Sequence, residues 1–140
     1  MKKRMDAKTF LGVGIGILVV ALLQHFLFSA PSIDSQIVKI ANEINKNCPF
    51  MVDSQTRLDN TVAGTGKTII YNYTLINYMK DDVDTDTFES NVKPRIINMI
   101  KTSPDMKYLR DNDVVFEYNY SDKTGIHIDQ LKIYPSDYKQ

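Results

Sequence analysis

The feature that most constrains this chain is a long apolar run close to its N-terminus. Residues 10–28 contain no acidic residue, no lysine and no arginine. As a helix, this run would be about 28 Å long at about 1.5 Å per residue, close to the roughly 30 Å of a bilayer's hydrocarbon core. A helix inside a globular protein is rarely apolar on every side over such a length. The run therefore predicts an uncleaved transmembrane helix, a signal anchor, bounded at residues 10–29.

A cleaved signal peptide is the alternative interpretation of the same segment. The apolar core of a signal peptide has about 7–15 residues and is followed by a small-x-small cleavage site. Cleavage after Ala30 would place Phe28 at the −3 position and Pro31 directly after the bond. Cleavage after Ser29 would place Leu27 at the −3 position. These bulky residues favour the anchor over cleavage.

The charges that flank the apolar run predict its orientation. Four lysine or arginine residues precede the run, whereas only Lys39 and Lys46 lie within about 20 residues after it. Because the more basic flank stays in the cytoplasm, we predict a short cytoplasmic tail at 1–9, the anchor at 10–29 and an exported domain at 30–140. The protein would then cross the inner (cytoplasmic) membrane once, with its C-terminal domain in the periplasm or outside the cell.

Two glycines in the apolar run bear on its oligomeric state. Gly12 and Gly16 have the spacing that lets two membrane helices approach closely. Glycine is also frequent in membrane helices generally. We therefore keep a homodimer through Gly12 and Gly16 as an alternative to a single helix whose partner is the lipid bilayer alone.

Composition argues against several functional classes. Residues 30–140 hold 13 basic and 16 acidic residues, a net charge of −3. Nucleic-acid binding needs clustered lysine and arginine, so we predict that this domain does not bind nucleic acid. Cys48 is the only cysteine and there are two histidines, which rules out an intrachain disulfide and argues against a zinc site. We predict no metal and no cofactor.

The exported part has the pattern of an α+β domain. Apolar residues at helical spacing, from Ile33 to Ile44, predict an amphipathic helix. A second helix is predicted at 87–102, with Asp86 and Glu89 at its start and Pro94 as a kink or a later start.

Alternating β-branched and aromatic residues predict two β-hairpins. The first joins strands at 50–59 and 68–79 through a turn at 63–66, and the second joins 114–120 and 126–134 through a turn at 121–125. The apolar parity changes within the last strand, which predicts a bulge near Asp129 and Gln130. The expected order is α-β-β-α-β-β, with a four-stranded antiparallel sheet and helices on one face.

Two site motifs fail on inspection. Residues 63–68 resemble the end of a phosphate-binding loop, but Thr61 replaces the required glycine and a strand follows instead of a helix. Residues 82–93 resemble a calcium loop, but Thr87 and Lys93 replace the glycine and glutamate that such a loop needs.

No familiar catalytic set is apparent. His127 and Asp129 share one strand parity, but nothing in the sequence brings Cys48 to them. We predict that the protein is not an enzyme. The alternative is a small envelope enzyme, whose polar residues would be Arg57, Asp59, His127 and Asp129.

Tyrosines are concentrated on the predicted strands. Tyr71, Tyr73, Tyr118 and Tyr120 all lie there. Tyrosine suits a half-buried pleated surface, and it is also enriched where proteins recognise one another. We keep both interpretations.

Several short segments resemble an uncharacterised family of small bacterial envelope or exported domains of unknown function, across residues 35–125. The matching segments are 47–53, 56–59, 71–75, 104–106, 110–112 and 118–125. The resemblance implies a bacterial source and an intact domain, and it provides no activity. It draws attention to Arg57 and Asp59, which can lie on one strand face because both alternate with Leu58.

These observations lead to one main hypothesis. We predict a membrane-anchored, non-enzymatic binding or accessory module of the bacterial cell envelope that recognises a protein partner through its sheet face or a sheet edge. The predicted binding residues are Arg57, Asp59, Tyr71, Tyr73, Tyr118 and Tyr120. A further alternative is an immunity or exclusion protein that acts against a toxin or a phage.

Overall fold

The computed structural model describes residues 32–140. The predicted cytoplasmic tail, the anchor and the Gly12–Gly16 pair lie outside the described residues, so these predictions are not tested here. Within residues 32–140, no helix is long and apolar enough to cross a bilayer.

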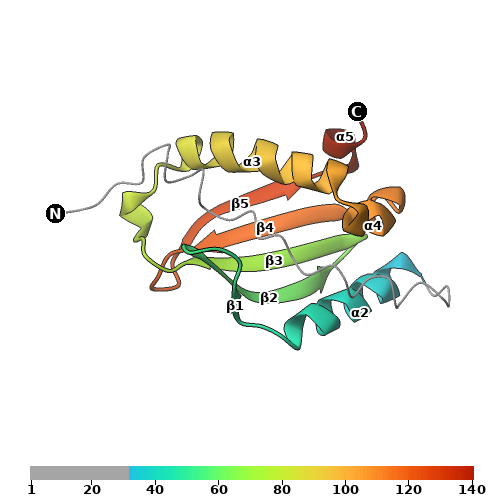
Figure 1. The fold of residues 1–140 in the computed structure, drawn as a ribbon, viewed down its shortest axis with the longest axis horizontal. Coiled ribbons are helices and arrows are strands. Elements are labelled where there is room, and N and C mark those ends of the chain that lie inside the picture. The colour runs from blue at the N-terminus through green and yellow to red at the C-terminus, as the bar shows by residue number, and fades with distance from the viewer. Residues whose placement is uncertain (1–31) are drawn as a thin grey trace.

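The described chain forms a five-stranded sheet with helices packed against it (Figure 1). The strands, in their order across the sheet, are β1 (Phe50–Met51), β2 (Thr56–Gly64), β3 (Thr68–Leu75), β4 (Val115–Ser121) and β5 (His127–Ile133). The helices are α2 (Ile33–Asn45), α3 (Thr85–Thr102), α4 (Lys107–Asp111) and α5 (Pro135–Tyr138), with short 3-10 turns η2 (Lys80–Asp82) and η3 (Pro104–Met106). The predicted α+β class and the order of its main elements are confirmed.

The relative direction of the strands differs from the prediction. β3 and β4 are parallel, whereas every other neighbouring pair is antiparallel. The reason is the long connection between them: α3 carries the chain back along the sheet, so β4 starts at the same end as β3. The predicted all-antiparallel sheet is therefore wrong, and the sheet is mixed.

The number of strands differs because the predicted strand 50–59 is broken. Asp53 Oδ1 accepts hydrogen bonds from the backbone N–H groups of Gln55 (2.6 Å) and Thr56 (2.9 Å). This turn folds the two residues of β1 back onto Leu58 and Arg57 of β2. The single expected strand thus becomes two, and the sheet has five strands instead of four.

Smaller boundaries shift for identifiable reasons. α3 begins two residues earlier than expected because Asp84 caps it, accepting from the Thr87 N–H (2.9 Å). Pro94 lies inside this helix. The register change in the second hairpin falls between Tyr120 and Ser121, which leaves Ile128 as the extra residue of β5, one position before the predicted bulge.

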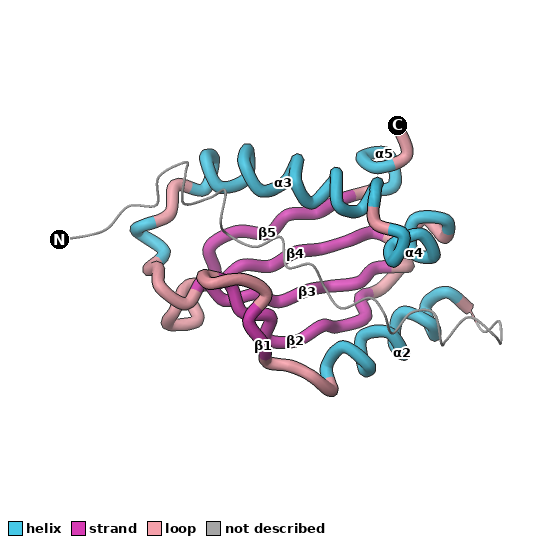
Figure 2. The backbone as a smooth tube through the Cα atoms, viewed as in Figure 1, coloured by secondary structure: helices cyan, strands magenta, loops and turns pink. Residues whose placement is uncertain are grey.

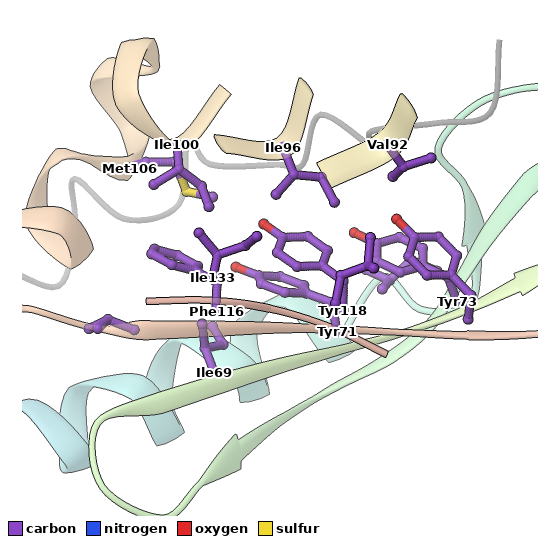
Figure 3. Close-up of a cluster of buried hydrophobic side chains, with 14 of the residues drawn as sticks. Ile69, Tyr71, Tyr73, Val92, Ile96, Ile100, Met106, Phe116, Tyr118 and Ile133 are labelled. Carbon is purple, nitrogen blue, oxygen red and sulfur yellow. The ribbon is translucent and has the colours of Figure 1, made fainter. Parts of the chain in front are cut away.

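The core lies between the helices and one face of the sheet. Figure 3 shows Tyr71, Tyr73 and Tyr118 pointing toward the side of α3 that carries Val92 and Ile96. α2 and α3 run along opposite edges of the sheet, α2 beside β2 and α3 beside β5 (Figure 2).

α2 covers the same face as α3. Leu58 on that face of β2 is completely buried, whereas Val62 on the other face is 45% exposed. No described helix covers the second face. Its alternate residues along β2 to β5 form what we call the open face.

Candidate functional site

The four predicted binding tyrosines lie in the interior. Tyr71, Tyr73, Tyr118 and Tyr120 are between 0% and 4% exposed. The rings of Tyr71 and Tyr118 stack at 5.1 Å and those of Tyr73 and Tyr120 at 5.3 Å. Burial raises the pKa of all four hydroxyls, so they stay neutral. These residues build the layer beneath α3 and offer almost no exposed surface. Their role in binding stays a prediction.

A row of four side-chain amides crosses the open face. Asn60, Asn72, Asn119 and Gln130 occupy registered positions on β2, β3, β4 and β5. Asn72 donates to Asn60 Oδ1 (2.8 Å), Asn119 donates to Asn72 Oδ1 (3.0 Å), and Gln130 donates to Asn119 Oδ1 (3.0 Å). We call this set the amide row.

The amide row has a direction. Asn72, Asn119 and Gln130 each donate toward β2, so the amide dipoles align and strengthen one another. Within residues 32–140, no hydrogen bond uses the side-chain N–H groups of Asn60 or the side-chain carbonyl of Gln130. The row therefore presents donors at its β2 end and an acceptor at its β5 end.

An acidic side chain fixes the β5 end of the row. Glu117 Oε1 accepts from Gln130 Nε2 (2.6 Å) and from Asn119 Nδ2 (3.3 Å). Its other oxygen lies 3.6 Å from Lys132 Nζ. Glu117 is nearly buried, so this carboxylate is held by several donors and does not project into solvent.

Arg57 and Asp59 lie on the open face beside the amide row. Arg57 Nε donates to Asp59 Oδ1 (2.6 Å), and Asp59 Oδ2 accepts from the Thr74 hydroxyl (2.5 Å). The register shift between Leu58 and Asn60 accommodates Asp59 as an extra residue in β2. The structure thus brings together the two polar residues that the sequence singled out.

Both edges of the sheet are partly closed. At the outer edge of β2, the Asn45 carboxamide binds both the N–H and the C=O of Thr61, each at 2.7 Å. On β5, Asp129 Oδ1 accepts from the Gln130 N–H (2.8 Å) next to the bulge at Ile128. Bulges and occupied backbone groups hinder the addition of a further strand. The open face is consequently the more available of the two predicted recognition surfaces.

The residues of the enzyme alternative do not converge. Arg57 and Asp59 lie on β2, while His127 and Asp129 lie on β5, three strand spacings or about 14 Å away. Asp129 lies opposite Tyr120 on the covered side, where burial raises the pKa of its carboxyl. The scattered placement gives no common site for a substrate.

Nucleophilic and metal chemistry find no support in the described residues either. Burial, with a contribution from Asp59, raises the pKa of the Cys48 thiol, which disfavours the reactive thiolate. Within residues 32–140, no group of three His, Cys, Asp or Glu side chains is placed to hold a metal ion.

The sequence contains a signal for the amide row, although the row was not predicted. The triplet Tyr-Asn-Tyr occurs at 71–73 and again at 118–120. Because strand residues alternate between faces, each central asparagine must lie on the other face of the sheet from its two tyrosines. The parallel pairing of β3 with β4 then brings Asn72 and Asn119 together.

Solved structures of bacterial proteins share this fold. One is described as a secreted protein from Pseudomonas aeruginosa, with a TM-score of 0.60 and 10% identity over 79% of this chain and 99% of that one. Another is the type II secretion system pilotin AspS from Vibrio cholerae, with a TM-score of 0.57 and 11% identity over 84% and 96%. The type 2 secretion system pilotin EpsS from Vibrio vulnificus has a TM-score of 0.54 and 6% identity over 77% and 93%.

At such low identity, these similarities show a common fold and nothing more. No curated protein matches the chain. A family model for a domain of unknown function, DUF8479, matches residues 32–128, nearly the whole of the described domain. This agrees with the resemblance to an uncharacterised family, and the chain belongs to the DUF8479 family.

Proposed function

We propose that this protein is a membrane-anchored, non-enzymatic accessory module of the bacterial cell envelope that binds a protein partner through the open face of its sheet. The observation that carries the proposal is the hydrogen-bonded amide row on a face that no described helix covers. Residues 10–28 supply the anchor, and the domain lies outside the cytoplasm.

The order of the open face supports binding. A flexible polar side chain loses about 0.5–1.5 kcal/mol of conformational freedom when a partner immobilises it. The four amides of the row are already held by one another and by Glu117. Binding a partner on these amides therefore costs less conformational entropy than binding on polar side chains that are free to move.

Arg57 is the expected anchor residue of the interface. Its Nε is committed to Asp59, and no hydrogen bond within residues 32–140 uses its terminal Nη groups. Arginine is enriched among residues that dominate binding energy. Exposed Met51 and Val62 provide nearby apolar contacts. This mixture of a fixed cation, amides and small apolar areas suits a protein surface.

The fold neighbours support an envelope role. They include a secreted protein and two pilotins of type II secretion systems. By extension, we propose that this domain serves a multi-protein assembly of the envelope. An immunity or exclusion role uses the same open face with a toxin or phage protein as the partner.

Site-specific photocrosslinking in cells tests the proposal. A benzophenone amino acid replaces Val62 or Gln130 on the open face, or Asn42 on α2 or Asn98 on α3 as exposed controls. We expect one discrete adduct from the two open-face positions and none from the controls. Adducts that form only from α2 or α3 contradict the proposal, and the identity of the adduct distinguishes an envelope component from a toxin.

A further inference from the structure

The two ends of the domain differ in their relation to the predicted anchor. One end contains the start of α2, the β2–β3 turn, α4 and α5 (Figure 1). Asp34 Oδ1 accepts from the Lys67 N–H (2.8 Å), and Lys67 O accepts from the Val115 N–H (2.9 Å). These contacts fix the β2–β3 turn beside the point where the chain enters the domain. We call this the tether end, and the opposite end the far end.

The tether is short. Only residues 29–31 separate the end of the predicted membrane helix from Ser32. At a maximum of about 3.6 Å per residue, the start of α2 stays within about 14 Å of the bilayer. The eight residues of β3 extend the domain about 26 Å from the tether end toward the far end. The tether therefore keeps one end near the membrane, and its length does not oblige the other end to be there.

Charge distinguishes the two ends strongly. The far end, at residues 52–55, 76–89 and 121–129, holds eight acidic and two basic residues, a net charge of −6. The tether end, at residues 32–35, 65–67, 101–115 and 134–140, holds five of each. An anionic bilayer surface attracts nearby lysines and repels carboxylates within a Debye length. The far end is thus disfavoured at such a surface.

Exposed lysines at the tether end can meet lipid phosphates. Lys67, Lys107 and Lys139 are all exposed. Lys107 pairs with Asp111, and Lys139 pairs with Asp113. The hydrogen bond from each lysine is the main influence that lowers the pKa of its aspartate. Surface pairs of this kind contribute little to stability, so the lysines can exchange these partners for phosphate.

We propose that the tether end is a lipid-contact surface, on which Lys67, Lys107 and Lys139 lie against the phosphate groups of an anionic bilayer while the acidic far end points away from it. This inference rests on the proposed membrane anchor. In this orientation the strands run roughly perpendicular to the membrane plane, and the open face is directed parallel to the bilayer, toward a neighbouring envelope protein.

Fluorescence quenching by lipid measures this orientation. The full-length Cys48→Ser protein carries one new cysteine, Thr65→Cys in the β2–β3 turn or Thr85→Cys at the far end, labelled with an environment-sensitive fluorophore. Both threonines are exposed, which makes them a matched pair. The vesicles contain phosphatidylethanolamine, phosphatidylglycerol and a lipid with a nitroxide on its headgroup. We expect quenching at position 65 and full fluorescence at position 85.

Two further arms separate the causes. Replacing phosphatidylglycerol with phosphatidylcholine, or introducing Lys67→Gln, Lys107→Gln and Lys139→Gln together, should reduce the quenching at position 65. Unchanged quenching in both overturns the role of charge, and equal quenching at positions 65 and 85 overturns the orientation. An alkaline wash of the same vesicles tests the anchor independently. Release refutes the anchor and this inference together, whereas retention with equal quenching refutes this inference alone.

Discussion

Asp122 provides the sharpest test of how this fold is held together. It is completely buried at the start of the β4–β5 turn. Its Oδ1 accepts from the Thr124 N–H (2.8 Å), the Thr124 hydroxyl (2.7 Å) and the Ile126 N–H (3.0 Å). Its Oδ2 accepts from the Lys80 N–H (3.0 Å). One carboxylate thus joins the second hairpin to the segment that leads into α3.

These hydrogen bonds make stability depend on pH. Burial alone would raise the pKa of Asp122, but the hydrogen bonds outweigh it and bring the pKa from 3.8 to about 2. At about 1.36 kcal/mol per pKa unit, the ionised form contributes about 2 kcal/mol to folding. Because the folded pKa is the lower one, this contribution is complete above about pH 5. It is lost as the pH falls through 3.8 toward 2.

The substitution Asp122→Asn should remove this contribution. The asparagine amide has no charge, and its N–H groups would face the N–H donors that now bind the carboxylate. We therefore expect the free energy of unfolding to fall by about 2–3 kcal/mol at pH 7. Urea unfolding of residues 32–140, followed by circular dichroism at pH 7, 5, 3 and 2, measures it. The difference from the unsubstituted domain should shrink between pH 5 and pH 2. Exposed Asp86→Asn is the control and should lose at most about 1 kcal/mol, from the helix dipole. A difference that stays constant down to pH 2 refutes the reasoning.

Three other predictions use the same unfolding measurement. Asn45→Ala leaves the N–H and C=O of Thr61 unpaired at the β2 edge, so it should lower the free energy of unfolding by about 1–3 kcal/mol. The exposed edge should also let molecules associate, which light scattering detects. A variant that is equally stable and stays monomeric contradicts the protection of this edge by Asn45. Tyr138→Phe loses the buried bond to Val114 O (2.8 Å), about 1 kcal/mol. Burial raises the Tyr138 pKa from 10.0 to about 12, so the neutral tyrosine contributes its full stabilisation below pH 10 and loses it as the pH rises toward 12. If the unfolding free energies of the two proteins change identically between pH 10 and pH 12, this prediction is wrong. Asp84→Ala removes the N-cap of α3 and should cost about 1 kcal/mol, with unchanged stability as the contrary result.

Local patterns in the sequence were sufficient to locate most elements. The isoleucine stripe of α2 and the alternation in β3 and β4 reflect a single buried face, and that face reads directly from spacing. The break between β1 and β2 depends instead on one side chain, Asp53, which accepts hydrogen bonds from the backbone N–H groups two and three residues after it. An uninterrupted alternating pattern does not reveal such a competing local bond.

The pairing of β3 with β4 was beyond the reach of local patterns. Both hairpins are set by short turns, but the order and direction in which they join depend on how α3 packs across the sheet. The choice between the two interpretations of the tyrosines was out of reach for a related reason. Tyr71 and Tyr118 have polarity that suits an interface or an interior, and only the position of α3 decides between them. Arg57 and Asp59, which neighbour each other locally, were correctly placed together.

The amide row is difficult to explain as a device for stability. Asparagine is depleted in strands, where β-branched residues are favoured on a scale that spans about 1 kcal/mol. Three asparagines at registered positions, two of them on the central strands β3 and β4, therefore work against local preference. Each hydrogen bond in the row returns about 0.5–1.5 kcal/mol at most, and solvent competes for it on an uncovered face. If solubility alone were required, charged residues would supply it without a registered chain of bonds. Conflicts between local preference and the fold are expected where a surface serves function, and the open face has such a conflict at its centre.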